Sequence, residues 1–442
     1  MRIGFVAMSG VRACDPELLT MGLTLPGFVE RGKTIAALPS LGALTLAALT
    51  PPEHEIHYLE VADLRLLPAL PAGFDLVAIS SFSAQILEAY ELADRFRAAG
   101  TKVVLGGLHV TSLPDEAGLH ADAVVIGEGE PVWPRVVEDA AAGRLEPRYC
   151  SVGEFRMEQA PMPRFDLLDV DRYNRLTVQT TRGCPLQCEF CASSILLTKR
   201  YKQKPIGRVL AEIDRIRELW RHPFIEFADD NSFLHREYWK ELLTELKSRR
   251  VRWFTECDLR VYQDEALLDL MRDSGCSEVL IGFESPIEAG LPGLELKSDW
   301  KHRRRAEYRE AIRTIQSRGI RVNGCFILGL DGQTNEIFDS VHDFARESEL
   351  YDVQITIQTP FPGTPLYRRL KKEGRLLHDG EWNRCTLFDI NYVPDAMSGQ
   401  ELHDGFRGLV RRLYSEETTR WRRENFNRRY LRPAMRARAA VV

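Results

Sequence analysis

The chain has 442 residues, of which 44% are hydrophobic and 28% are charged. These proportions are those of an ordinary globular protein and exclude the disordered and fibrous classes. The net charge of −5 gives no reason to expect a nucleic-acid partner. No run of about 18 to 20 apolar residues and no signal sequence is present, so we expect no transmembrane segment. We therefore expect a cytoplasmic protein of two to three domains whose nine cysteines are reduced.

The first part of the chain alternates short β-branched runs with helical patterns. Strands are expected at residues 2–7, 55–61, 75–82, 101–107 and 123–127, and a helix at 83–100. This alternation predicts an α/β fold, with a doubly wound, Rossmann-like domain over residues 1–147. A proline-bearing stretch, residues 148–176, is expected to be a linker.

Six further strand candidates alternate with helical patterns in the second part of the chain. They lie at 177–183, 224–230, 252–258, 278–285, 320–330 and 353–362. Consecutive β/α units of this kind predict a partial (β/α)6 barrel over residues 177–365. The pattern then weakens, and residues 366–442 are expected to form a mostly helical region. Its arginine-rich end is interpreted as a solvated amphipathic helix, with an anionic partner or membrane surface as the alternative.

Three cysteines, Cys184, Cys188 and Cys191, lie within eight positions just after the first expected barrel strand. Barrel enzymes place their chemistry in the loops at this end of the strands. A zinc site would need a fourth ligand, and no Cys or His follows at the usual short spacing. A four-iron cluster can instead take three thiolates and leave one iron open for a non-protein ligand. A zinc-binding or buried cysteine cluster remains the alternative.

The CxxxCxxC spacing, with Phe190 directly before the last cysteine, resembles the signature of the radical S-adenosylmethionine (radical SAM) superfamily. The resemblance implies a [4Fe-4S] cluster on the three cysteines, with S-adenosylmethionine chelated to the open iron through its amino and carboxylate groups. It also implies an external electron donor of the flavodoxin or ferredoxin type. One electron from the reduced cluster then cleaves the sulfonium, usually giving a 5′-deoxyadenosyl radical.

The same resemblance implies contacts to S-adenosylmethionine from later strands. Polar residues at the end of the second strand are expected near the methionine moiety, although the family's Gly-Gly-Glu is absent there. Two residues at the end of the fourth strand are expected near the ribose, and two glycines of the fifth near the adenine. The implied residues are Phe190, Asp229, Asp230, Asn231, Glu284, Ser285, Gly324 and Gly329.

Three expected strands of the first domain end in the runs SSFS, GGLHVT and GEGE. Small hydroxyl residues and glycines leave room for a bulky ligand at the carboxyl edge of a doubly wound sheet. Their order and spacing resemble the cobalamin-binding domain, so the chain resembles the cobalamin-binding subgroup of radical SAM enzymes from Met1 to about Ser415. The implied cobalamin-binding residues are Ser80, Ser81, Ser83, Gly106, Gly107, His109, Gly127 and Glu128.

One departure concerns the axial ligand of cobalt. Domains that ligate cobalt through histidine carry Asp-x-His-x-x-Gly after the first strand, and residues 7–22 contain no histidine. We expect cobalamin to bind without such a ligand, and the alternative is a relic domain that binds nothing. His109 is expected to be a hydrogen-bonding residue rather than the lower ligand.

The resemblance implies a transferase that moves a methyl group to an unactivated carbon or phosphorus of a small natural-product or lipid-like molecule. One S-adenosylmethionine would methylate cob(I)alamin, a second would supply the radical that abstracts a substrate hydrogen, and the substrate radical would then take the methyl group. No separate catalytic acid or base is expected. Transfer of a 3-amino-3-carboxypropyl group, a rearrangement and an oxidation stay open. An iron–sulfur electron carrier or a corrinoid-binding module is the non-enzymatic alternative.

Overall fold

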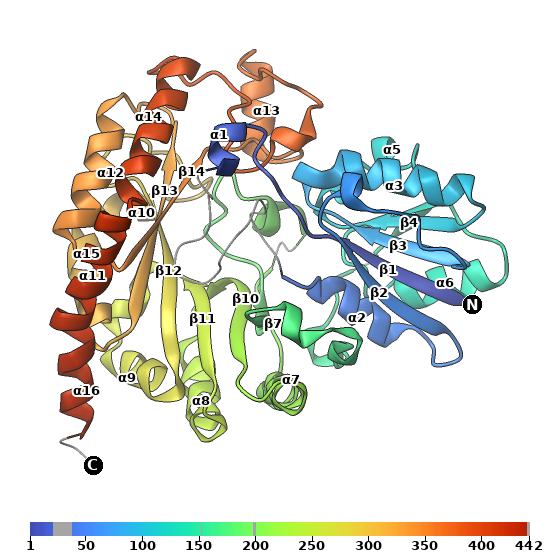
Figure 1. The fold of residues 1–442 in the computed structure, drawn as a ribbon, viewed down its shortest axis with the longest axis horizontal. Coiled ribbons are helices and arrows are strands. Elements are labelled where there is room, and N and C mark those ends of the chain that lie inside the picture. The colour runs from blue at the N-terminus through green and yellow to red at the C-terminus, as the bar shows by residue number, and fades with distance from the viewer. Residues whose placement is uncertain (21–37, 152, 198–199, 440–442) are drawn as a thin grey trace.

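The structure is a computed structural model that describes residues 1–20, 38–151, 153–197 and 200–439. It has three parts in chain order: a sheet domain, a larger open barrel and a C-terminal helical region. Figure 1 shows the first sheet beside the barrel, with its central strands directed towards it, and the C-terminal helices along the barrel's opposite outer side. None of the described helices is long and apolar enough to span a membrane.

The first sheet has six parallel strands in the order β2-β1-β3-β4-β5-β6. Alternate residues of β1 face opposite sides, so Phe5 packs with the core under α2 and α6 and Val6 with the core under α3. This confirms the predicted doubly wound domain. The strands are β1 Arg2–Met8, β2 Glu55–Val61, β3 Leu76–Ser80, β4 Lys102–Gly106, β5 Ala123–Ile126 and β6 Arg148–Cys150. The helices are α1 Pro16–Thr20, α2 Leu41–Leu49, α3 Ile86–Ala98, α4 Leu108–Ser112, α5 Pro114–Ala117 and α6 Trp133–Ala141.

The second sheet is the predicted partial barrel, with six parallel strands in the order β14-β13-β12-β11-β10-β7. Consecutive strands are neighbours, as right-handed β/α units require. The strands are β7 Leu176–Val178, β10 Phe224–Ser232, β11 Arg252–Cys257, β12 Cys276–Glu284, β13 Arg321–Leu328 and β14 Asp352–Ile357. A separate antiparallel pair consists of β8 Thr181–Arg182 and β9 Lys202–Gln203. The helices are α7 Ile206–Leu219, α8 Arg236–Leu246, α9 Glu265–Ser274, α10 Trp300–Arg304, α11 Tyr308–Ser317 and α12 Glu336–Glu347.

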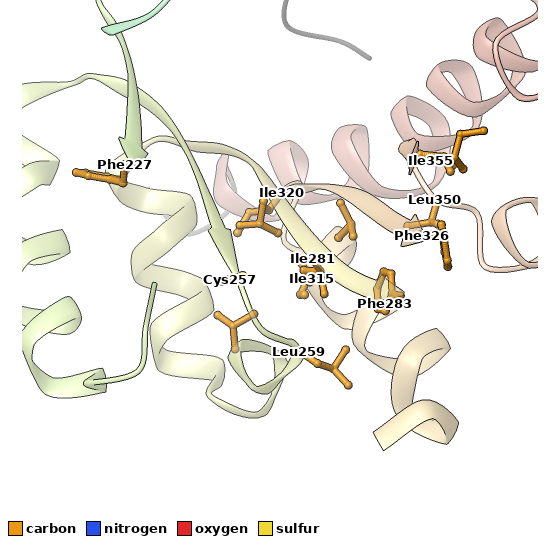
Figure 2. Close-up of a cluster of buried hydrophobic side chains, with 14 of the residues drawn as sticks. Phe227, Cys257, Leu259, Ile281, Phe283, Ile315, Ile320, Phe326, Leu350 and Ile355 are labelled. Atoms are coloured by element: carbon orange, nitrogen blue, oxygen red, sulfur yellow. The ribbon is translucent and has the colours of Figure 1, made fainter. Parts of the chain in front are cut away.

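The core of the barrel domain lies between its strands and their covering helices. Figure 2 shows Ile281 and Phe283 of β12 and Phe326 of β13 in this layer, together with Ile315 of α11. Successive side chains of a strand point to opposite faces. The intervening residues, such as Gly282, therefore face the concave inside of the barrel, where the chemistry is expected.

The C-terminal region joins the other two parts, and it is mostly helical, as predicted. Its helix α14 buries Phe406 and Leu409 in the main barrel core, whereas Trp382 belongs to the core of the first domain. The helices are α13 Pro365–Lys372, α14 Gly399–Leu413, α15 Glu416–Phe426 and α16 Arg432–Ala439. The last three residues of the arginine-rich end, 440–442, lie outside the described residues, as do residues 21 and 22 of the stretch searched for a cobalt ligand.

Candidate functional site

The three cysteines lie in one loop at the carboxyl end of the barrel strands, after β7 and β8. Cys188 is buried, and Cys184 and Cys191 are half-buried. The backbone N–H of Cys191 donates to the carbonyl oxygen of Cys188 at 3.0 Å and closes a turn between them. Burial raises the pKa of the Cys188 thiol to about 12 and also raises the pKa of the Cys184 thiol. Cys191 lies close enough to both thiols to raise their pKa values as well.

The cysteine loop does not form a compact site for a single metal ion. Among the described residues, no three His, Cys, Asp or Glu side chains are close enough together to hold one metal ion. Structural zinc gathers four such ligands around one ion. In an iron–sulfur cluster the thiolates bind different irons, so their sulfurs stay further apart.

Two carboxylates at the end of β10 hold the backbone that leads into the cysteine loop. Asp229 is 4% exposed and accepts from the backbone N–H groups of Thr180 and Thr181 at 2.8 and 2.9 Å. Asp230 accepts from the backbone N–H of Gly183 at 2.6 Å. Both were predicted to contact S-adenosylmethionine, and in the structure both support the loop that carries the cysteines.

Asn231 is the third residue of this run, and it reaches a cysteine directly. Its side-chain amide donates to Cys184 Sγ at 3.6 Å, and its Oδ1 accepts from the backbone N–H of Asp258 at 3.0 Å. Asp258 in turn orients the guanidinium of Arg260, because its two carboxylate oxygens accept from Arg260 Nε at 3.0 and 3.1 Å. The hydrogen bonds to Asp258 raise the pKa of Arg260, and burial opposes this rise. Cys184 lies near enough to Arg260 to raise its pKa as well. Sequence reasoning did not find Arg260.

The end of β12 forms a second polar group beside the cysteines. Glu284, 5% exposed with φ of +61°, forms an ion pair with the buried Lys301, whose Nζ also donates to the Gly282 carbonyl at 3.2 Å. A Cβ at Gly282 would lie 2.6 Å from Glu284 Oε1, so a larger residue there would displace the Glu284 carboxylate. The Ser285 hydroxyl is fully buried and has no hydrogen-bond partner among the described residues. The charge of Lys301 opposes the rise in the pKa of the Cys188 thiol, and this lysine was not predicted from the sequence.

The remaining residues predicted for S-adenosylmethionine pack against protein. Phe190 lies against the hydrophobic cluster beside β13. A Cβ at Gly324 would lie 2.9 Å from Leu350 Cδ1, and one at Gly329 (φ +83°) would lie 2.1 Å from the Tyr392 hydroxyl oxygen. Tyr392 donates its hydroxyl to the Gly329 carbonyl at 2.7 Å. Core packing and the C-terminal region therefore explain why these two residues are glycines.

Five of the residues predicted for cobalamin lie together at the carboxyl edge of the first sheet. Ser80 ends β3 and Ser81 follows it, Gly106 ends the neighbouring β4 and Gly107 follows it, and Gly127 follows β5. Gly107 has φ of +109°, and a Cβ there would lie 3.5 Å from Ser80 Oγ. All five are half-buried. The edge therefore offers small side chains and partly open backbone to a ligand.

Ser83 and His109 belong to the same edge but turn into the domain. His109 is 1% exposed, and its Nδ1 and Nε2 lie 3.1 Å from Ser83 Oγ and 3.3 Å from Glu116 Oε1. Glu116 also accepts from the indole N–H of Trp382 at 3.0 Å. Both nitrogens of His109 thus have protein partners, and the C-terminal region contributes to this network through Trp382.

Glu128, the last residue predicted for cobalamin, joins the first domain to the cysteine loop. It is 8% exposed and accepts from Arg182 at 2.9 Å and from Lys202 Nζ at 2.8 Å. Arg182 lies two residues before Cys184 and also forms an ion pair with Glu130. The edge of the first sheet and the cysteine loop therefore border one another.

Comparison with known proteins agrees with this arrangement. The model of the radical SAM superfamily matches residues 178–345, that of the B12 binding domain matches residues 36–137, and a domain of unknown function, DUF4070, matches residues 364–440. An uncharacterized methyltransferase of Synechocystis is 30% identical over 370 residues, which cover 81% of this chain and 67% of the relative. The chain belongs to the cobalamin-binding radical SAM family. A radical SAM domain implies a [4Fe-4S] cluster and S-adenosylmethionine, and a B12 binding domain implies cobalamin.

Two further proteins are similar to this radical SAM chain. Bacteriochlorophyllide d C-12(1)-methyltransferase of Chlorobaculum tepidum is 28% identical over 381 residues, covering 85% of this chain and 82% of the relative. The radical SAM methyltransferase TsrM of Kitasatospora setae, solved with cobalamin and a [4Fe-4S] cluster bound, has the same fold with a TM-score of 0.63 at 16% identity, over 94% of this chain and 86% of TsrM. Membership of the radical SAM family makes this chain an enzyme, and the electron-carrier and corrinoid-module alternatives no longer apply.

Proposed function

We propose that this radical SAM enzyme transfers a methyl group, with cobalamin, to an unactivated carbon or phosphorus of a small molecule. The observation that carries the proposal is the contact between Arg182 and Glu128, because it joins the cysteine loop to the cobalamin edge of the first sheet. A reaction that uses two cofactors on one substrate needs their sites to be adjacent. The relatives, which are named as methyltransferases, support methyl transfer in particular.

The chain's own residues would bind and orient the cofactors. When bound, the cluster, S-adenosylmethionine and cobalamin supply the electron transfer, the radical and the methyl group. Cys184, Cys188 and Cys191 would hold the cluster, and the Asn231 amide would stabilise negative charge on Cys184 Sγ. An external donor of the flavodoxin or ferredoxin type would deliver the electron.

Two cations beside the cysteine loop suit the carboxylate of S-adenosylmethionine. Arg260 lies near Cys184, and Lys301 lies near Cys188. Ion pairs with Asp258 and Glu284, respectively, fix the orientation of the two cations. Charge-assisted hydrogen bonds from such groups are roughly twice as strong as neutral ones. The unpartnered Ser285 hydroxyl beside them would serve the ribose or the methionine moiety.

The first domain would hold cobalamin on the edge formed by Ser80, Ser81, Gly106, Gly107 and Gly127. The buried network of Ser83 and His109 lies directly behind this edge and fixes it. Because both nitrogens of His109 have protein partners, cobalamin would bind without His109 as its axial ligand.

The nucleoside products of an anaerobic reaction test the proposal. The protein reconstituted with cluster and cobalamin would be incubated with S-adenosylmethionine and a reductant, and the products resolved by mass spectrometry. We expect S-adenosylhomocysteine together with 5′-deoxyadenosine, and no 5′-deoxyadenosine from the Cys188→Ala variant. 5′-Methylthioadenosine in place of both would assign 3-amino-3-carboxypropyl transfer instead, and the absence of every product would contradict the proposal.

A further inference from the structure

Glu256 is a carboxylate on the inside of the barrel that has no hydrogen bond or ion pair with any of the described residues. Glu256 lies on β11 next to Cys257, which Figure 2 shows among the side chains that face the helical layer. By strand alternation Glu256 faces the concave interior. Its side chain nevertheless keeps exposed surface, so the interior beside it is open.

The acidic side chains around Glu256 are paired, whereas Glu256 is not. Glu226 forms an ion pair with Arg175, and Glu284 forms one with Lys301. In the part of the chain that the structure describes, no hydrogen bond or ion pair holds the Glu256 carboxylate. Carboxylates that face the protein interior ordinarily have a cation or donors beside them.

The strands opposite Glu256 contribute further acceptors. In the sheet register, Gln354 of β14 lies beside Cys325 of β13, and Cys325 lies beside Gly282 of β12. Gly282 has no side chain and therefore leaves space there. The Oε1 atoms of Gln354 and of Gln358, which is 2% exposed, are buried and have no hydrogen-bond partner in the described part of the chain. Burial raises the pKa of the Cys325 thiol, and nearby acids including Glu256 raise it further, so Cys325 and Glu256 face the same space.

We propose that Glu256, Cys325, Gln354 and Gln358 line the substrate pocket, and that Glu256 binds a protonated amine of the substrate. The inference rests on the proposed function and names the chemical class of its substrate. The two buried glutamine oxygens and the Glu256 carboxylate have no donors among the described residues, and a ligand that brings donors would satisfy them. A carboxylate among other acids favours a cation over a neutral or anionic group.

Position along the strand separates this site from the cysteine loop. Asp258, directly after β11, contacts Asn231 and, through it, the loop of Cys184. Glu256 lies two residues earlier on the same face, and so about 7 Å deeper in the barrel. An amine bound there would lie deeper in the barrel than the cysteine loop.

Binding of small amines to the holoenzyme tests the inference. Titration calorimetry at pH 8 would compare benzylamine, benzyl alcohol and benzoate, which share a ring and differ in the polar group. We expect wild type to prefer benzylamine, and Glu256→Gln to weaken benzylamine binding by about tenfold or more. Glu241→Gln, which alters an exposed carboxylate on α8, should leave the affinity unchanged. The affinity for S-adenosylmethionine should be the same in all three proteins.

Several results would overturn the inference. They are absence of benzylamine binding to wild type, equal affinity in wild type and Glu256→Gln, or a preference for benzoate. Loss of S-adenosylmethionine affinity in Glu256→Gln would also do so, since it would place Glu256 at the cofactor. Amine binding does not depend on turnover, so the two proposals can fail separately. Intact amine binding without methyl transfer would contradict the proposed function alone. Methyl transfer without amine binding would contradict the substrate pocket alone.

Discussion

An ionised carboxylate without a partner inside the barrel costs stability. Burial raises the pKa of the Glu256 carboxyl from its usual value of about 4.5 to about 7, and Glu226, Asp230 and Glu284 add to the rise while Arg175 opposes it. The folded chain therefore holds this proton more tightly than the unfolded chain does. The stability that protonated Glu256 contributes is present below about pH 4.5 and is lost as the pH rises to about 7.

Glu256→Gln removes this pH-dependent cost. We expect the variant to melt at a higher temperature than wild type at pH 8 and to lose that advantage at pH 5, as measured by scanning calorimetry without substrate. Glu241→Gln, on the exposed surface of α8, is the matched control and should show no such change with pH. An offset for Glu256→Gln that is equal at both pH values would contradict the account of this residue.

The hydrogen bond from Asn231 to Cys184 Sγ should tune the cluster. Donors to cluster sulfurs stabilise the more negative, reduced state, so their loss lowers the reduction potential. We expect Asn231→Ala to lower the midpoint potential by roughly tens of millivolts in an EPR-monitored redox titration. The control is Asn335→Ala, whose amide contacts Glu401 on the protein surface. An unchanged potential in an Asn231→Ala protein with full iron content would show that the contact does not act on the cluster.

At the scale of elements, the C-terminal turn that carries Trp382 supports the cobalamin edge. Its indole N–H donates to Glu116, which also contacts His109 just after Gly107. Trp382→Phe keeps an aromatic ring and removes this donor, at a cost of about 1 kcal/mol. We expect cobalamin to bind about fivefold more weakly, as measured by its absorbance after equilibrium dialysis. Trp220→Phe, at the end of α7, is the control, and equal cobalamin affinity in Trp382→Phe and wild type would contradict this role.

Strands could be predicted from the sequence because they obey a local period. The strand candidates of both domains correspond to observed strands, since β-branched runs bounded by turns are buried on parallel sheets. The strand β6 lies in the stretch predicted as a linker, because three residues, Arg148 to Cys150, are too few to show a period. Sheet pairing with β5, rather than local preference, makes this segment a strand.

The site could be predicted only where its residues are close in sequence. The cysteine spacing is such a signal, and so are the glycine and serine runs at the strand ends. Arg260, Lys301 and Trp382 reach the site through tertiary contacts between distant segments, and none of them belongs to a local motif. The contacts of Glu128 with Arg182 and of Asp229 with the backbone of Thr180 could not be predicted either, because each joins segments that are distant in sequence.

At the scale of the whole molecule, the contact between domains depends on a nearly buried ion cluster. Arg182, Lys202, Glu128 and Glu130 are all mostly shielded from solvent. Removing the shared cation leaves buried carboxylates without full compensation, which costs about 3 kcal/mol or more. We expect Arg182→Met to lower the free energy of unfolding by roughly that amount in urea denaturation.

The control for this cluster is an exposed ion pair. Arg215 pairs with Glu218 on the surface of α7, and such pairs contribute about 0 to 1 kcal/mol. Arg215→Met should therefore leave the unfolding midpoint nearly unchanged. If both variants lost the same small amount, the cluster would not stabilise the join between the first domain and the barrel.

The central claim is that one chain uses both cofactors for methyl transfer. Its most direct test is the rate of S-adenosylhomocysteine formation in protein that carries a full cluster, measured with increasing amounts of bound cobalamin. The account predicts a rate that rises in proportion to bound cobalamin and is close to zero without it. S-adenosylhomocysteine formed equally well without cobalamin, or not formed at all at full cobalamin loading, would contradict it.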